Sequence, residues 1–194
     1  MIEHVTVEQI RSWPMREGWH VAPTTGERVK LGSNVIIGSN VSIDSNVSIN
    51  SNVIIGNYVT IDSCVSIGSN VIIDSNVSIG SNVSIDHDVI IGSYSTLGSN
   101  VRIDSHVRIG SYVRIPVYRG AEFPMHWASV GHIRSGCLCK SFQWWRENVV
   151  RCAEEHKYSE GEQKLYAFFI EQIIAWETMM VAAGLLGMAK KGGE

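Results

Sequence analysis

The chain has few cysteines, no long run of basic residues and no apolar segment at its N-terminus. Its four cysteines are unevenly spaced and give no sign of a disulfide framework, so we expect a reducing, cytoplasmic environment. The net charge of −3 argues against nucleic acid as a partner, because a nucleic-acid backbone is bound by a basic surface. Glu3 and His4 interrupt the start of the chain, so no signal peptide is expected.

The dominant feature of the sequence is a six-residue motif that repeats without an inserted loop from residue 31 to residue 115. Each unit opens with Ile or Leu, and Val follows four places later in every unit except at Ser95. Val and the next Ile are two residues apart, so both point to the same side of an extended strand. The remaining places hold mostly Gly, Asp, Ser and Asn, and Gly and Asn tolerate the positive φ of sharp corners. A strand this short cannot bury its apolar side alone, so the pattern predicts stacked coils of a parallel β-helix.

A second period, of eighteen residues, predicts the cross-section of this β-helix. The outward position in the middle of each strand is Ile once in every eighteen residues, at Ile36, Ile54, Ile72 and Ile90. Ser or Thr fills the corresponding position of the other early units. Because eighteen is three times six, we expect a triangular prism of about five coils with one face that carries a column of Ile. An exposed Ile column on a soluble protein needs a cover, which could be a neighbouring prism or the C-terminal helices of the same chain.

Residues 1–30 are expected to cap the open end of the first coil. Thr6 and Gln9 form a capping-box pattern, which predicts a short helix from Val7 to Trp13 that ends before Pro14. A cap is needed because the terminal coil of a β-helix would otherwise expose its core and its unpaired strand edge.

Beyond the repeats, residues 116–129 contain two prolines and predict an irregular excursion, and residues 130–133 could return as a last strand. We therefore assign 31–135 to the β-helix and 136–194 to a helical extension. Ser141 is the expected N-cap of one helix, and Ser159 with Glu162 forms the capping box of a second.

The second of these helices is expected to continue to about residue 186 and to form an α-helical hairpin with the first. Its predicted apolar stripe consists of Leu165, Phe169, Ile173, Trp176 and Met180. Glu171, Gln172 and Glu177 interrupt the apolar segment, so we expect no membrane insertion.

The six-residue motif resembles the hexapeptide repeat of the left-handed β-helix superfamily, best known from acyl-CoA-dependent acyltransferases. The resemblance covers residues 31–115 and implies left-handed coils. It also implies a homotrimer held by the Ile36, Ile54, Ile72 and Ile90 face and the C-terminal helices, with a coenzyme A thioester as donor to a small hydroxyl or amine. Many members build their acceptor pocket with a loop inserted in the repeats, which this chain lacks. A non-catalytic trimeric scaffold, or a protein that binds a small anion, therefore stays open as the alternative.

The candidate catalytic residues are His87, Asp88 and His106. Asp88 and His106 are eighteen residues apart and share a corner, and His87 is adjacent to Asp88. A histidine held by a carboxylate is a common general base, and the resemblance implies a histidine base between two subunits. The alternative is that these are ordinary polar residues of a solvated corner. Stacked coils would bring the two histidines within about 5–8 Å of each other.

The candidate cofactor-binding residues are basic and aromatic and lie near the C-terminal end of the repeats. Arginine fills the outward position of three successive units, and these arginines could contact the phosphates of coenzyme A or simply keep the surface soluble. Two tyrosines eighteen residues apart could flank a flat ligand or only stabilise a corner. The full set is Arg102, Arg108, Arg114, Arg119, Tyr94 and Tyr112.

No metal site is expected from the sequence. His126, His132, Cys137 and Cys139 are of metal-ligating types, but their spacing fits no familiar zinc pattern.

Overall fold

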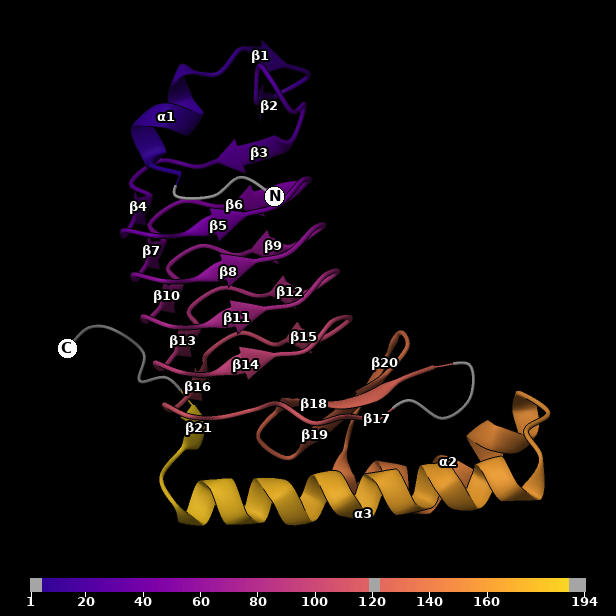
Figure 1. The fold of residues 1–194 in the computed structure, drawn as a ribbon. Coiled ribbons are helices and arrows are strands. Elements are labelled where there is room, and N and C mark those ends of the chain that lie inside the picture. The colour runs from indigo at the N-terminus through magenta and orange to yellow at the C-terminus, as the bar shows by residue number, and fades with distance from the viewer. Residues whose placement is uncertain (1–4, 119–122, 189–194) are drawn as a thin grey trace.

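The computed structural model describes residues 5–118 and 123–188 of the chain. Figure 1 shows a prism of stacked coils, a small cap at its N-terminal end, and an antiparallel sheet and two helices across its other end. The coils advance in a left-handed sense from the N-terminal cap towards the helices, so the left-handed parallel β-helix expected from the sequence is confirmed.

The prism has three faces, each a parallel sheet. The face that carries the Ile column, called the isoleucine face here, consists of β4 (Ile36–Ile37), β7 (Ile54–Ile55), β10 (Ile72–Ile73), β13 (Ile90–Ile91) and β16 (Val107–Ile109). The second face consists of β5 (Ser42–Ile43), β8 (Thr60–Ile61), β11 (Ser78–Ile79) and β14 (Thr96–Leu97). The third consists of β3 (Arg28–Leu31), β6 (Val47–Ile49), β9 (Ser66–Ile67), β12 (Ser84–Ile85) and β15 (Arg102–Ile103).

Residues eighteen apart pair in every parallel ladder, for example Ile54 with Ile72 and Ser84 with Arg102. The predicted triangular cross-section is therefore confirmed, with four complete coils between β4 and β15 and further strands before and after them. The ladder begins earlier than the repeat does, because Val29 in β3 already pairs with Val47.

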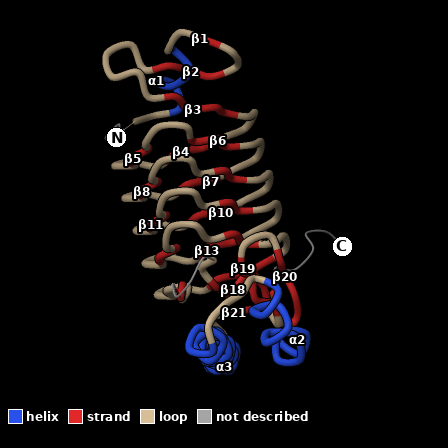
Figure 2. Tube along the Cα trace, turned by 90° about the vertical axis from the view of Figure 1, so that its right-hand side faces the viewer, coloured by secondary structure: helices blue, strands red, loops and turns tan. Residues whose placement is uncertain are grey.

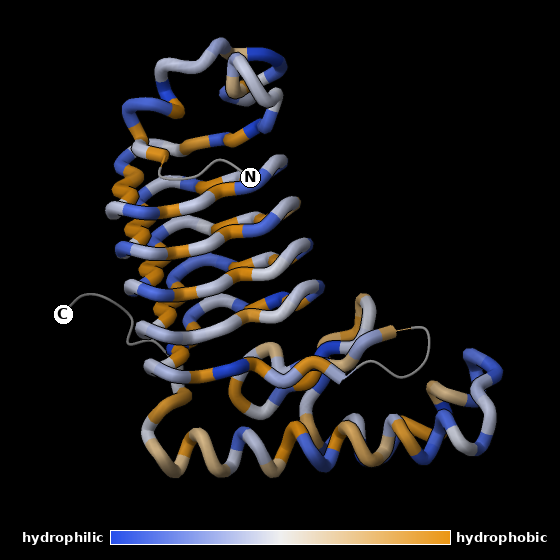
Figure 3. The backbone as a smooth tube through the Cα atoms, viewed as in Figure 1, coloured by the Kyte–Doolittle hydropathy of each residue, from blue (hydrophilic) through white to orange (hydrophobic). Residues whose placement is uncertain are grey.

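The inward Val and Ile side chains form one continuous buried core along the prism. Figure 3 shows the apolar segments stacked at the same place in successive coils. Ser95 stands where the other units have Val, and its buried hydroxyl donates to the carbonyl of Gly110 and accepts from the amide of Val113. By contrast, the outward side chains of Ile36, Ile54 and Ile72 are exposed by 59%, 43% and 37% in the single chain.

The Asn and Gly positions of each corner have different roles. The Asn position adopts φ between 54° and 64°, which a residue with a side chain rarely does, whereas the Gly position has negative φ. Glycine is needed there for close approach: a Cβ atom at Gly68 would lie 2.6 Å from the carbonyl carbon of Asp86 and 2.7 Å from the amide nitrogen of His87.

The N-terminal cap agrees with the expectation from the sequence. Helix α1 (Val7–Ser12) has the Thr6–Gln9 capping box, and Ile10 is fully buried against the core of the prism. The hairpin of β1 (Met15–Arg16) and β2 (Trp19–Val21) then extends the third face through β3. This arrangement pairs the strand edge that the first coil would otherwise expose.

The segment after the prism differs from the prediction. Instead of an irregular excursion and one last strand, it forms a four-stranded antiparallel sheet of β17 (Val117–Tyr118), β18 (Met125–Ser129), β19 (His132–Ser135) and β20 (Leu138–Ser141). All five residues of β18 are buried, because the sheet lies between the last coil and the helices (Figure 1). A strand buried on both faces has no alternation of polar and apolar residues, so the sequence pattern did not reveal it.

The predicted α-helical hairpin is confirmed. Helix α2 (Phe142–Glu155) begins after the Ser141 N-cap, and α3 (Glu160–Ala182) begins after the Ser159–Glu162 capping box. Figure 2 shows both helices side by side at the far end of the prism. By length and composition α3 could cross a membrane, as many core helices of soluble proteins could, and the expectation that it does not stays a prediction.

Two details of α3 were predicted wrongly. The helix ends at Ala182 rather than near residue 186, because Gly184 has a φ of +70° and Leu185 donates its amide hydrogen to the carbonyl of Met180, a Schellman motif. The chain then pairs with β16 as β21 (Leu186–Met188). The buried face is also rotated: Leu165 is exposed, whereas Glu177 is buried.

Candidate functional site

The three candidate catalytic residues meet at one edge of the prism, where the third face turns into the isoleucine face. This histidine corner consists of His87 and Asp88, between β12 and β13, and of His106, between β15 and β16. Asp88 and His106 occupy the Asn position of their units, with φ of 58° and 61°. The amide of His106 donates to the carbonyl of His87 at 3.1 Å, which sets the two coils in register.

The side chains of the histidine corner contact one another. Nδ1 of His87 lies 2.7 Å from Oδ2 of Asp88, and Nδ1 of His106 lies 3.6 Å from the same oxygen. The two imidazole centroids are 5.0 Å apart, in the predicted range, and their planes cross at 88°. Of the two histidines, His87 is therefore the one that the carboxylate holds.

The protonation of this pair follows from its hydrogen bonds. Hydrogen bonds from His87 and then from Asn70 hold the pKa of Asp88 below its usual value, so the carboxylate is charged at neutral pH. A carboxylate can only accept, so Nδ1 of His87 donates the hydrogen in this bond. The lone pair of a neutral His87 is then on Nε2, which does not face Asp88. The His87 side chain is 51% exposed, so a solute can reach it.

A ladder of amides supports Asp88 from the preceding coils. Asn34 donates to Asn52, Asn52 to Asn70, and Asn70 to Oδ1 of Asp88, at 3.0, 3.1 and 3.0 Å. Each bond passes from one coil to the next, so the stacked corners fix the orientation of the carboxylate. The two oxygens of Asp88 are divided between this ladder and the histidines.

The same three side chains are the one group in the described part of the chain that could hold a metal ion. Their ligand atoms lie within 4.8 Å of one another. His126, His132, Cys137 and Cys139 do not form such a group within the described residues.

The three arginines of the repeats point away from one another. Arg102 lies on the third face, where its guanidinium is 3.6 Å from the carboxylate of Asp86. Arg108 extends the Ile column, since it pairs with Ile90, and Arg114 pairs with Thr96 on the second face. One chain therefore cannot bring all three to one ligand. Arg119 lies outside the described residues.

The predicted tyrosine pair is present at a different edge of the prism. Tyr94 and Tyr112 stack with their ring centroids 5.0 Å apart and their planes 2° from parallel. Both rings are exposed, and neither contacts the histidine corner.

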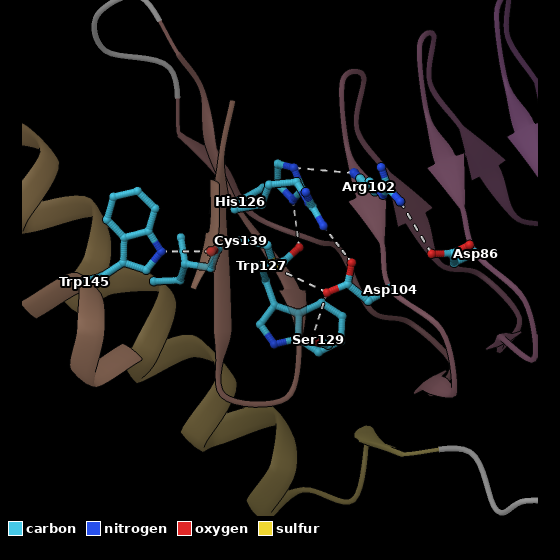
Figure 4. Close-up of polar contacts among 10 residues, drawn as sticks. Asp86, Arg102, Asp104, His126, Trp127, Ser129, Cys139 and Trp145 are labelled. Atoms are coloured by element: carbon cyan, nitrogen blue, oxygen red, sulfur yellow. Dashed lines mark hydrogen bonds and ion pairs between the residues drawn. The ribbon is translucent and has the colours of Figure 1, made fainter. Parts of the chain in front are cut away.

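The sequence did not reveal a cavity between the third face and the antiparallel sheet. The cavity has a volume of about 640 Å³, and its lining includes Arg102 on one wall and His126 and Arg134 on the other. Figure 4 shows the contacts that join these walls. No local pattern could have indicated this cavity, because it depends on the position of the unexpected sheet.

His126 and Cys139 are two ionisable side chains near this cavity whose pKa values are shifted towards the uncharged form. Nδ1 of His126 donates to the carbonyl of Trp127 at 2.8 Å, and Nε2 accepts from the backbone amide of Arg102 at 3.4 Å (Figure 4). Burial lowers the pKa of His126, so its ring is neutral. Burial and then the charge of Asp104 raise the pKa of the Cys139 thiol to about 11. These two residues therefore serve as uncharged parts of the structure.

Comparison with known proteins identifies the repeats. Residues 28–63 and 64–99 match the family model described as bacterial transferase hexapeptide (six repeats). The match includes His87 and Asp88 and ends before Arg102. No curated protein matches the chain.

Proposed function

We propose that the protein transfers an acyl group from a coenzyme A thioester to a small hydroxyl or amine, because residues 28–99 match the repeat of a family described as bacterial transferases. His87 is the general base, Asp88 orients it, and His106 lines the same site. The observation that supports this proposal is the 2.7 Å contact between the imidazole of His87 and the carboxylate of Asp88 at a solvent-accessible edge.

The proposed step needs one base and no bound metal. Nε2 of His87 removes a proton from the acceptor as its oxygen or nitrogen attacks the thioester carbonyl. The tetrahedral adduct then expels coenzyme A by cleavage of the C–S bond, and the proton on Nε2 passes to the departing sulfur. Asp88 stabilises the imidazolium that forms between these two events.

The proposed enzyme is a homotrimer in which the isoleucine face of each chain packs against a neighbour. Exposed Ile36, Ile54 and Ile72 form a continuous apolar column, which is unfavourable in water. The histidine corner borders this face, so the acyl donor would lie in a cleft between two subunits. Arg108, at the end of the Ile column, borders this cleft and could contact the phosphates of the donor.

Replacement of Ile72 by Arg is expected to dissociate the trimer without unfolding the chain. The trimer should dissociate because the new arginines would be buried at the interface and repel one another. The single chain should still fold because the outward Ile column already contains Arg108. Light scattering at micromolar concentration should then give the mass of one chain, 21.5 kDa, instead of three. Ser78→Arg, at the equivalent place of the second face, is the control and should stay trimeric. A monomeric wild-type protein would contradict the proposed assembly.

The alternative function is the capture of a small anion without turnover. The uninterrupted repeats and the cavity lined by two arginines favour it. A transfer assay separates the two functions: the protein is incubated with acetyl-CoA and a panel of small amines and alcohols, and the released thiol is measured. We expect thiol release that depends on one of the acceptors. If the protein does not bind acetyl-CoA, the acyltransferase function is excluded and capture of a small anion remains as the proposed function.

A further inference from the structure

We propose that the cavity between the third face of the prism and the antiparallel sheet binds a carboxylate or phosphate group of a small molecule. The ligand would be the acceptor of the acyl group, an anionic hydroxyl or amine compound, and in this respect the inference rests on the proposed function. The binding of the anion itself does not require the transfer reaction.

The shape of the cavity suits a small ligand. Its volume of about 640 Å³ is in the range of pockets that bind metabolite-sized molecules. One wall consists of the outward residues of β12 and β15, including Ser84 and Arg102. The other wall consists of β18, β19 and the turn that follows, including His126, Arg134 and Gly136.

The charge of the lining favours an anion. Among the described residues of the lining, two carry a guanidinium and none carries a carboxylate. Arg134 is largely buried and is anchored by a 2.7 Å ion pair with Asp104, which uses only part of its five N–H donors. The Arg102 side chain is 51% exposed, and its distance of 3.6 Å from Asp86 exceeds that of a good hydrogen bond. Arg102 can therefore turn from Asp86 to a ligand at small cost.

The rest of the lining is polar but uncharged. Asn82 and Asn100 offer amide groups, and Ser84 offers a hydroxyl. His126 adds no charge, since both of its ring nitrogens are used in hydrogen bonds to the backbone. A ligand oxyanion would thus meet the two arginines without competition from a charged group on the opposite wall.

The cavity lies next to the histidine corner along the chain. Asp86, the partner of Arg102, directly precedes His87, and adjacent Cα atoms are about 3.8 Å apart. Arg102 and His106 are four positions apart in the same coil, so their Cα atoms lie at most roughly 13 Å from each other. An acceptor about 10 Å long could place its anionic group in the cavity and its amine or hydroxyl at the corner.

Calorimetric titration of the intact protein with succinate, and separately with inorganic phosphate, tests this site at low ionic strength. We expect saturable binding of at least one probe, and the stronger probe indicates whether the site prefers a carboxylate or a phosphate. Arg102→Gln should weaken binding about tenfold, which is typical for loss of a charge-assisted hydrogen bond. Arg114→Gln removes the same charge from the second face and should leave the affinity unchanged.

A second pair of variants tests the position of the ligand. Ser84→Asp places a carboxylate beside Arg102, its partner in the ladder, and should abolish binding, whereas Ser66→Asp lies one coil away and should not. The site is excluded if neither probe binds the wild type saturably, or if Arg102→Gln binds as tightly as Arg114→Gln. If the protein shows transfer activity that requires His87 but binds neither probe, only the anion site is excluded. If it binds a probe in a way that requires Arg102 but shows no turnover, only the acyltransferase function is excluded.

Discussion

Replacement of His87 by Asn is expected to lower kcat for acyl transfer by roughly 10²–10⁴-fold, the usual contribution of a positioned general base. Asparagine keeps polarity and approximate size but cannot accept the acceptor's proton at neutral pH. The fold should survive, because His87 is an exposed corner residue whose backbone amide lies against Gly68. The measurement is the steady-state rate of thiol release from acetyl-CoA at saturating acceptor.

Three further variants test whether the loss of rate in His87→Asn is due to the loss of the general base. Asp88→Asn should reduce the rate less than His87→Asn, since the base remains but loses its charged partner. His106→Asn should have a smaller effect, because its imidazole is 3.6 Å from Asp88 and is not held by it. His132→Asn changes an exposed histidine bonded only to a backbone carbonyl and should leave the rate unchanged. If His87→Asn and His132→Asn have equal rates, His87 is not the base.

Loss of the Asp88 charge is not expected to limit the rate in the neutral range. The pKa of Asp88 is depressed in the folded chain, so its favourable contacts are present above the ordinary carboxylate pKa and are lost only as the pH falls through the lowered value. In the neutral range Asp88 is therefore always charged. Acidification should remove the contribution of Asp88 to the rate only below the ordinary carboxylate pKa.

Replacement of Glu177 by Leu is expected to destabilise the chain by about 3 kcal/mol, a typical cost when buried donors lose a charged acceptor. Glu177 is buried between α3 and the antiparallel sheet. Its Oε2 accepts from the indole N–H of Trp127 at 2.6 Å and from the amide of Gly131 at 2.8 Å. Leucine has a similar volume but leaves both donors without a partner. Urea unfolding followed by tryptophan fluorescence measures the change.

The control for this prediction is on the same helix. Glu171 forms an exposed ion pair with Arg146, so Glu171→Leu should cost less than about 1 kcal/mol. Glu177→Gln keeps a carbonyl acceptor and should fall between the two. If Glu177→Leu is no more destabilising than Glu171→Leu, the contacts of Glu177 do not hold the helix on the sheet.

The periodic part of the fold could be predicted residue by residue. Val-x-Ile alternation and the eighteen-residue period place every inward and outward side chain, so the stacking of His106 over Asp88 followed from their spacing. The same reasoning placed Tyr94 against Tyr112. Local capping signals at Thr6, Ser141 and Ser159 also identified the helix starts, because capping depends on residues three apart.

The predictions failed where long-range contacts decide the conformation. The strand Met125–Ser129 was missed because it is buried on both sides. The burial of Glu177 was not predicted, because its partners, Trp127 and Gly131, are about fifty residues away. The cavity lined by Arg102 and Arg134 depends on the same contacts.

Repetition alone was sufficient to specify the prism, since each coil has the same neighbours as the next and local rules apply throughout. The antiparallel sheet, the orientation of α3 and the charged cavity were decided only by packing between distant segments. Their buried polar groups form hydrogen bonds with residues that are far away in the sequence and close only in the folded chain, so the spacing of residues does not predict these contacts.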